Sequence, residues 1–217
     1  MNEDTAQTRP YKGRSPDERK AERRRRLIKA ARELWGDQGW AGVSMRGVCS
    51  LARLNDRYFY ESFADVESLL LAVYDQGLEE LVGRMGQSIA SAPAQPEQLV
   101  GAAVATFVHA LASDPRAARI GLAEPAGSPA LEQRRRDTYH VFADIGIAAA
   151  RAHLPNRTID EAVLRMDALF ALGGLGELVL TWLTGSLPAT EDELVEHITK
   201  AVLAIGAPHL RNPEATG

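Results

Sequence analysis

The side chains best suited to chemistry lie in one short stretch, NDRYFYESF over residues 55–63. Phe59 and Phe63 are four residues apart, so on a helix they share one face and can pack inward. The other faces then carry polar and aromatic groups, namely Asp56, Arg57, Tyr58, Tyr60 and Glu61. Guanidinium and phenol groups displayed on a short helix can bind base edges and phosphates, so the chemistry indicated is recognition of nucleic acid.

Two short helices would position these groups. Ser44 can cap the first helix, because its side-chain oxygen accepts from free amides of the first turn. Val48, Leu51 and Ala52 give that helix an inward face. The pair Arg53-Leu54 is typical of a tight connection, and Asn55 caps the second helix. This pattern predicts a helix-turn-helix whose second helix is sized for the major groove.

The stretch from Ser44 to Leu70, with a helix before it and a long helix after it, resembles the DNA-binding end of the tetracycline-repressor (TetR) family of bacterial regulators. The matching residues are Ser44, Val48, Leu51, Phe59, Tyr60, Phe63, Asp65, Glu67, Leu69 and Leu70. Three positions depart from the family pattern, which usually has Gly at 53, often Gly at 57, and Lys at 66. This chain has Arg53, Arg57 and Val66 there.

Charge is divided unevenly along the 217 residues. Residues 1–60 hold 14 Lys/Arg and 8 Asp/Glu, a net +6, whereas residues 61–217 hold 11 and 21, a net −10. A basic N-terminal part is suited to contact with phosphate. We expect Arg46 and one or two residues of the run 23–26, for which Arg23 and Arg26 are the candidates, to approach the DNA backbone. Asn55 and the outer residues of the second helix are also expected at the DNA, where Arg57, Tyr58 and Tyr60 contact either bases or phosphates. Residues 1–14 are either a solvated tail or an arm that touches DNA.

The remaining sequence predicts an all-α protein. Capping boxes and Pro or Gly breaks give about nine helices and no strand, near 15–37, 44–52, 55–63, 65–91, 96–113, 115–123, 128–153, 158–185 and 190–206. Residues 1–63 are expected to form a DNA-binding domain with three helices. Residues 64–217 are expected to form a helical ligand-sensing and dimerisation domain.

The stretch from Ala168 to Gly185 is apolar almost all round. It is barely long enough for a membrane span and contains Glu177, so a helix buried on several sides is favoured. The resemblance implies that the last two long helices of each subunit form a four-helix dimer interface. The residues expected there are Gly173, Leu194, Ile198, Val202 and Ile205, although the glycines could instead serve packing within one subunit.

The C-terminal part also offers candidates for a small-molecule pocket. Aromatic and sulfur side chains that should face one another are Phe107, Tyr139, Phe142, Met166, Phe170 and Trp182, with His109, Glu124 and His140 as polar candidates. Pockets are mostly apolar with a few placed polar groups. The same residues would look identical in an ordinary core, so the pocket itself is implied by the family resemblance.

Motifs for other chemistry are absent. The sequence has no Gly-rich phosphate loop, no GxSxG and no HExxH, so neither an enzyme nor a cofactor is indicated. His140 and Asp144 are four apart but lack a third metal ligand. The single cysteine, Cys49, is expected in the core, and a polar N-terminus predicts a cytoplasmic protein. We therefore expect a homodimeric, ligand-responsive regulator of operator DNA, a repressor in most of the resembled family. The alternative is a helical dimeric small-molecule-binding protein or enzyme without DNA binding.

Overall fold

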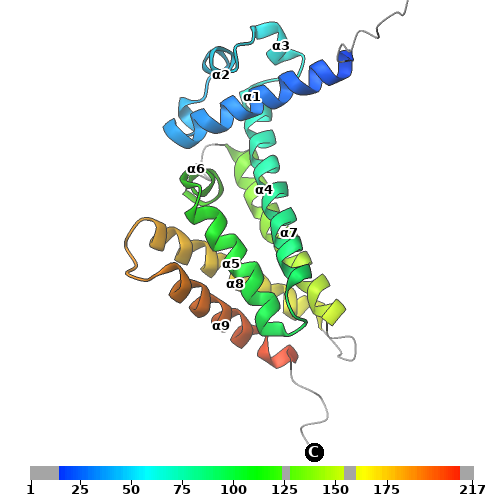
Figure 1. Cartoon of the computed structure of the whole chain (residues 1–217), viewed down its shortest axis with the longest axis vertical. Coiled ribbons are helices and arrows are strands. Elements are labelled where there is room, and N and C mark those ends of the chain that lie inside the picture. The colour runs from blue at the N-terminus through cyan, green and yellow to red at the C-terminus, as the bar shows by residue number, and fades with distance from the viewer. Residues whose placement is uncertain (1–14, 124–127, 154–159, 211–217) are drawn as a thin grey trace, which may run out of the picture.

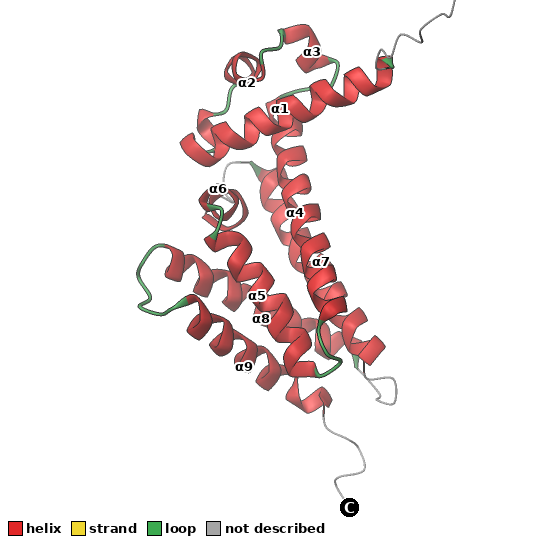
Figure 2. Cartoon of the chain, in the orientation of Figure 1, coloured by secondary structure: helices red, strands yellow, loops and turns green. Residues whose placement is uncertain are grey.

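The computed structural model of the chain describes residues 15–123, 128–153 and 160–210, and within them every regular element is a helix (Figure 2). The elements are α1 (Pro16–Gln38), the 3-10 turn η1 (Trp40–Gly42), α2 (Met45–Ala52), α3 (Asp56–Tyr60), α4 (Val66–Ser91), α5 (Pro96–Ala112), α6 (Pro115–Ala118), the π-helical segment η2 (Arg119–Ala123), α7 (Pro129–His153), α8 (Glu161–Leu183) and α9 (Glu191–Leu210). The expected all-α class is confirmed.

The helices are arranged in two groups along the long axis (Figure 1). The first three, here called the head, lie at one end, and α4 runs from the head along the second group. That second group, here called the body, consists of α5 to α9 with η2. α6 and η2 lie directly beneath α1, so the head and the body touch at the C-terminal half of α1 as well as through α4.

Side-chain caps explain where three of the helices begin. Ser15 Oγ accepts from the amide of Glu18 at 3.1 Å, and the Glu18 carboxylate accepts from the Ser15 amide at 2.6 Å. Asp65 and Ser68 form the same reciprocal pair at the start of α4. Thr190 and Glu193 do so at the start of α9, where the hydrogen bonds from Thr190 lower the pKa of the Glu193 carboxyl. Each cap satisfies amides that a helix start would otherwise leave unpaired.

The core of the head continues into the first turns of α4. Leu27 and Trp35 on α1, Val48 on α2 and Phe59 on α3 are almost completely buried. Leu69, Leu70, Val73 and Tyr74 of α4 belong to the same buried cluster. Leu51, expected to face inward, is instead 46% exposed, because Val48, Cys49 and Ala52 form the face of α2 that packs on α1.

The body is less evenly buried than its apolar sequence indicates. α5 packs against α4 and α9, and Val104, Val108, Leu194 and Ile198 are buried between them. In α8 the buried positions are Gly176 and Val179, so the helix expected to be buried on several sides exposes much of its surface. No helix in the described ranges is long and apolar enough to cross a membrane.

Candidate nucleic-acid interface and ligand cavity

The short helix α3 presents its polar residues outward as the sequence suggested. Asn55 Oδ1 accepts from the amide of Tyr58 at 3.3 Å and so caps the helix. Phe59 and Phe63 are buried, with ring centroids 6.0 Å apart, and they attach α3 to the head core. Asp56, Arg57 and Tyr60 are exposed. The helix therefore displays a carboxylate, a guanidinium and a phenol on a surface that no described part of the chain covers.

Arg57 is held only loosely on this surface. Its side chain is 83% exposed, and Nε lies 3.1 Å from Oε1 of Glu61, one turn further along. The second oxygen of Glu61 lies 3.3 Å from Nη2 of Arg23, whose guanidinium also stacks over the Tyr58 ring at 4.4 Å. Because exposed ion pairs contribute little, Arg57 can exchange Glu61 for a base edge or a phosphate at small cost.

The arginines of the run 23–26 mostly hold the helix-turn-helix in place. Arg24 donates to the carbonyl of Ser62 at 3.0 Å and stacks over Phe63 at 4.3 Å. Arg26 donates to the carbonyls of Ala52 and Arg53 at the end of α2. Arg25, by contrast, pairs with Glu22 on its own helix. Arg26, expected at the DNA backbone, thus supplies donors to the carbonyls that a helix end leaves unpaired.

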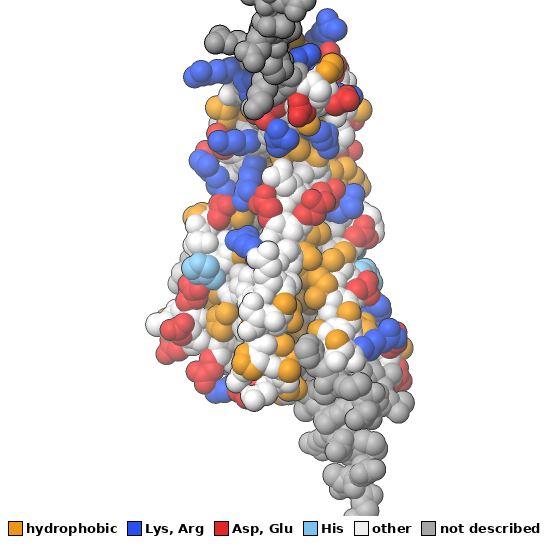
Figure 3. All heavy atoms as spheres, turned by 45° about the vertical axis from the view of Figure 1, so that its right-hand side comes forward, with side chains coloured by type: hydrophobic (Ala, Val, Ile, Leu, Met, Phe, Trp, Pro, Cys, Tyr) orange, Lys and Arg blue, Asp and Glu red, His pale blue; other side chains and the backbone are white. Residues whose placement is uncertain are grey.

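The turn between α2 and α3 depends on Arg53. Its backbone is left-handed (φ 53°, ψ 48°), the conformation for which glycine is normally selected. The Arg53 amide donates to Ser50 O at 3.1 Å, and the Leu54 amide donates to Cys49 O at 2.9 Å. The turn is therefore closed in the usual way despite the departure from Gly, and Arg46 remains exposed on α2. Lys and Arg side chains crowd this end of the molecule on the face shown in Figure 3.

Cys49 does no chemistry in this arrangement. It is 4% exposed, and burial raises the pKa of its thiol, with a further contribution from the nearby Asp56 carboxylate. A protonated thiol is a poor nucleophile. The described ranges also contain no group of three or more His, Cys, Asp or Glu side chains that could hold a metal ion.

The body contains a cavity of about 450 Å³, within the range of small-molecule sites. Its wall is mainly apolar and comes chiefly from α4, α5, η2, α7, α8 and α9, with Arg32 of α1 and Ala117 of α6 at its edge. Three of the expected ligand-binding residues, Phe107, Tyr139 and Phe142, line it. The rings of Phe107 and Phe142 meet edge to face, with centroids 6.3 Å apart.

The structure places the other expected pocket residues elsewhere. His109 is exposed and lies 3.2 Å from Glu191, and His140 is also exposed. Met166 and Phe170 are 61% and 76% exposed on α8. Trp182 donates from its indole to Ala189 O at 2.7 Å, and Glu124 lies outside the described residues. The expectation for these residues assumed that every aromatic face in the body turns inward, and the partly exposed α8 does not satisfy it.

Sequence reasoning overlooked the polar groups of the cavity. Tyr74 and Thr138 share a hydrogen bond of 3.1 Å, and burial raises the pKa of the Tyr74 phenol. Arg135 donates to the Tyr139 hydroxyl at 3.1 Å. Residues 135, 138, 139 and 142 all line the cavity, which is the spacing of one helix face. This stripe of mixed polar and apolar residues on α7 is the sequence pattern from which the polar groups of the cavity could have been predicted.

The residues expected at a dimer interface occupy different environments. Leu194 and Ile198 are 2% and 4% exposed and pack within the subunit against α5, so they offer no surface to a second copy. Val202 and Ile205 are partly buried and line the cavity, which Gly173 of α8 also borders. The exposed apolar residues of α8 are instead Met166 and Phe170.

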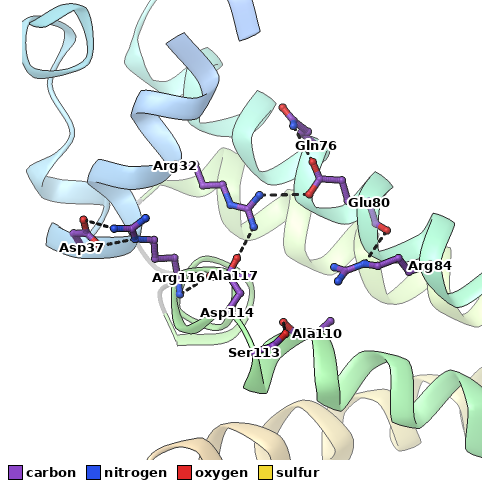
Figure 4. A network of polar contacts seen from close by, with 10 residues as sticks. All are labelled: Arg32, Asp37, Gln76, Glu80, Arg84, Ala110, Ser113, Asp114, Arg116 and Ala117. Carbon is purple, nitrogen blue, oxygen red and sulfur yellow. Dashed lines mark hydrogen bonds and ion pairs between the residues drawn. The ribbon is translucent and has the colours of Figure 1, made fainter. Parts of the chain in front are cut away.

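An ion-pair network joins the cavity side of the body to the head (Figure 4). Arg32 of α1 lies 2.7 Å from Asp114, which caps α6, and 3.4 Å from Glu80 of α4. Arg116 of α6 makes a bidentate contact with Asp37 near the end of α1, at 2.6 and 2.9 Å. These pairs are partly exposed, so their geometry rather than their strength is informative.

Backbone contacts bring α6 and η2 tightly against α1. Arg119 donates to the carbonyls of Asp37 at 3.1 Å and Gly36 at 3.4 Å. A methyl group at Gly36 would come within 2.4 Å of Cβ and Cγ of Arg116, so only glycine allows this approach. We call the contact of Gly36 and Asp37 with Arg116 and Arg119 the head–body latch.

The fold and the head define a class of protein, the helix-turn-helix DNA-binding regulators with an all-α body. Residues 27–73 match the family described as "Bacterial regulatory proteins, tetR family". Over these residues the chain is similar to that family of bacterial regulators. The residues matched run from Leu27 to Val73, so they comprise most of α1, the helix-turn-helix and the first turns of α4.

Solved structures with this fold extend the likeness over most of the chain. The fatty acid degradation regulator FadR from Bacillus halodurans is 17% identical, with a TM-score of 0.68 over 88% of this chain and 97% of that one. FadR from Bacillus subtilis, solved in complex with stearoyl-CoA, is 17% identical with a TM-score of 0.65 over 83% and 96%. A putative transcriptional regulator from Pseudomonas aeruginosa is 16% identical with a TM-score of 0.70 over 89% and 93%. At these identities the likeness concerns the fold.

Proposed function

We propose that the protein is a homodimeric repressor whose affinity for operator DNA falls when an elongated, mainly apolar molecule binds in the body. The observation that carries this proposal is the mainly apolar cavity of about 450 Å³ in the body, because small-molecule sites are typically apolar spaces of this size. In this scheme residues 1–63 bind DNA, and residues 64–217 bind the effector and the second subunit. Two recognition helices of a dimer would enter successive major grooves roughly 34–36 Å apart.

The shape of the cavity favours a chain-like ligand. Lining residues on α4 extend from Val73 to Ile89, sixteen residues along one helix, which is on the order of 24 Å. Leu78, Leu81 and Met85 lie between them on the same wall. An elongated, apolar space suits an aliphatic chain better than a compact ring system. The stearoyl-CoA bound to FadR of Bacillus subtilis, which has this fold, supports an acyl chain as the ligand class.

The head–body latch provides a route from the ligand to DNA. Ile120 and Leu122 of η2 line the cavity, and Arg119 beside them donates to the end of α1. A ligand that displaces η2 would therefore move α6 relative to α1 and change the spacing of the two heads. By linkage, the ligand lowers DNA affinity only as far as it prefers the displaced arrangement.

The direct test measures operator binding as a function of salt and of ligand. A duplex selected from a random library should bind with an affinity that falls steeply with salt, because phosphate contacts release counterions. Replacement Arg46→Ala should reduce the slope of log affinity against log salt by about one unit, whereas Arg136→Ala on the exposed side of α7 should not. Saturating lauroyl-CoA should lower the affinity of the wild-type protein for this duplex at least about tenfold, an effect within the usual range of coupling energies.

The alternative, a small-molecule-binding protein or enzyme that does not act on DNA, predicts the opposite results. If this alternative holds, the protein shows no salt-dependent affinity for duplex DNA. If it is an enzyme, it also converts the added acyl compound. Binding of ligand without any binding of DNA would therefore overturn the proposal while leaving the cavity assignment intact.

A further inference from the structure

The first turns of α7 carry three consecutive arginines whose side chains lie in different environments. Arg134 lies 3.3 Å from Asp75 of α4, and Arg136 lies 3.7 Å from Glu132, so both outer arginines have carboxylate partners. Arg135 lies between them and lines the cavity. Within the described ranges no carboxylate pairs with Arg135. The chain thus directs one unneutralised guanidinium into a mainly apolar space.

The hydrogen bonds of Arg135 are also incomplete. Nη1 donates to the Tyr139 hydroxyl at 3.1 Å, and the guanidinium lies 5.7 Å from the centre of the Tyr139 ring. The Nε atom is buried and has no acceptor among the described residues. A guanidinium cannot lose its proton at ordinary pH, so the partly buried Arg135 side chain keeps a permanent charge and an unused donor. Such a group is costly unless an anion joins it.

The other charged residues of the cavity wall do not satisfy Arg135. Arg32 is neutralised by Asp114 and Glu80. Arg84 donates to the backbone oxygen of Glu80 at 3.4 Å. Asp167 and Glu177 also line the cavity, but Asp167 has its own interaction and Glu177 is exposed to solvent. Neither forms an ion pair with Arg135 in the described part of the chain.

We propose that Arg135 is the anchor for an anionic group on the effector, either a carboxylate or a phosphate, and that the aliphatic part extends from it along α4 toward Ile89. This inference rests on the proposed function of the cavity as the effector site. Tyr139, Tyr74 and Thr138 adjoin Arg135 and supply further hydroxyl groups to the anion. The anchor lies near the start of α7, beside the first turns of α4, so the charged end of the effector faces the head.

The anchor can be tested by comparing three ligands with one aliphatic chain and different ends. Laurate carries a carboxylate, lauroyl-CoA carries phosphates, and dodecanol is neutral. We expect calorimetric titration of the wild-type protein to show binding of laurate or lauroyl-CoA about ten- to hundredfold tighter than binding of dodecanol, the contribution of a charged hydrogen bond. Whichever anion shows the preference identifies the source of the charge.

The variants assign this preference to one residue. Arg135→Gln should abolish it while the affinity for dodecanol stays unchanged, which also shows that the cavity is still formed. Arg135→Lys should retain most of the preference for the anionic ligand. Arg136→Gln is the matched surface control and should retain the whole preference. A preference that survives Arg135→Gln, or its absence in the wild-type protein, overturns the anchor. If all three ligands bind equally and release DNA, the proposed function stands without the anchor; if no ligand binds, both the ligand class and the anchor are wrong.

Discussion

At the scale of single residues, the surface pair of Arg57 and Glu61 determines what α3 can read. Arg57 is 83% exposed and needs only to leave Glu61 to reach the major groove. We expect Arg57→Ala to relax base preference at one symmetric pair of operator positions by about 1–3 kcal/mol, because a guanidinium can donate to both acceptors of a guanine edge. Binding of a library of operator variants measures this. A uniform loss at every position would instead identify Arg57 as a backbone contact.

The role of a single residue could be predicted when its partners lie close to it in the sequence. The Asn55 cap and the inward pair Phe59 and Phe63 follow from neighbours within four positions, and they were predicted. Arg26 reaches Ala52, 26 positions away, and Arg135 faces a cavity lined by residues from distant parts of the chain. No local pattern contains that information, so both roles were missed. Phe170 was misplaced for the same reason, since its exposure depends on how α8 packs.

At the scale of elements, the contact of α6 with α1 is the feature most open to test. Gly36→Ala places a methyl group 2.4 Å from Cβ and Cγ of Arg116, and the Cβ cannot move away unless α6 moves. We expect the variant to bind lauroyl-CoA normally but to lose most of the ligand-induced fall in DNA affinity, because the head–body latch can no longer close. Fluorescence anisotropy of a labelled operator with and without ligand measures the response.

A second glycine provides the control for Gly36→Ala. Gly83 lies on an exposed part of α4 with nothing within 4 Å of the added methyl group. Gly83→Ala should raise stability by about 0.5–1 kcal/mol through helix propensity and leave the ligand response unchanged. An unchanged response in Gly36→Ala as well would remove the latch from the mechanism.

Element boundaries were predicted closely wherever a cap or a proline defines them. The starts of α1, α4 and α9 follow the capping residues Ser15, Asp65 and Thr190. The π-helical η2 was not foreseen, since residues 115–123 were expected as one helix. Its geometry is selected by contacts with α1 and α8, which lie far away in the sequence.

At the scale of the whole molecule, the proposed dimer makes two substitutions behave differently. Phe170 is 76% exposed in the protomer, so Phe170→Asp should cost the protomer little and give folded monomers. Ile198 is 4% exposed, so Ile198→Asp should bury a charge and lower stability by several kcal/mol, on the order of the cost of an unpaired buried group. Light scattering with thermal melts separates these outcomes. A stable dimer of Phe170→Asp would place the subunit contact away from this face of α8.

Helix α4 belongs to both the head and the body, and this limits where two regulators of this kind can be joined by recombination. Leu69, Leu70 and Val73 complete the head core, and from Val73 onward the same helix forms the cavity wall. A recombination junction at residue 63, between the domains expected from the sequence, would give the incoming head the α4 of another protein and so a mismatched core. A junction after Tyr74 would transfer the head together with its α4 residues, and of this buried cluster Ile120 and Leu131 would then come from the other parent. Chimaeric regulators that keep the DNA specificity of one parent and the effector of the other should therefore be joined within α4.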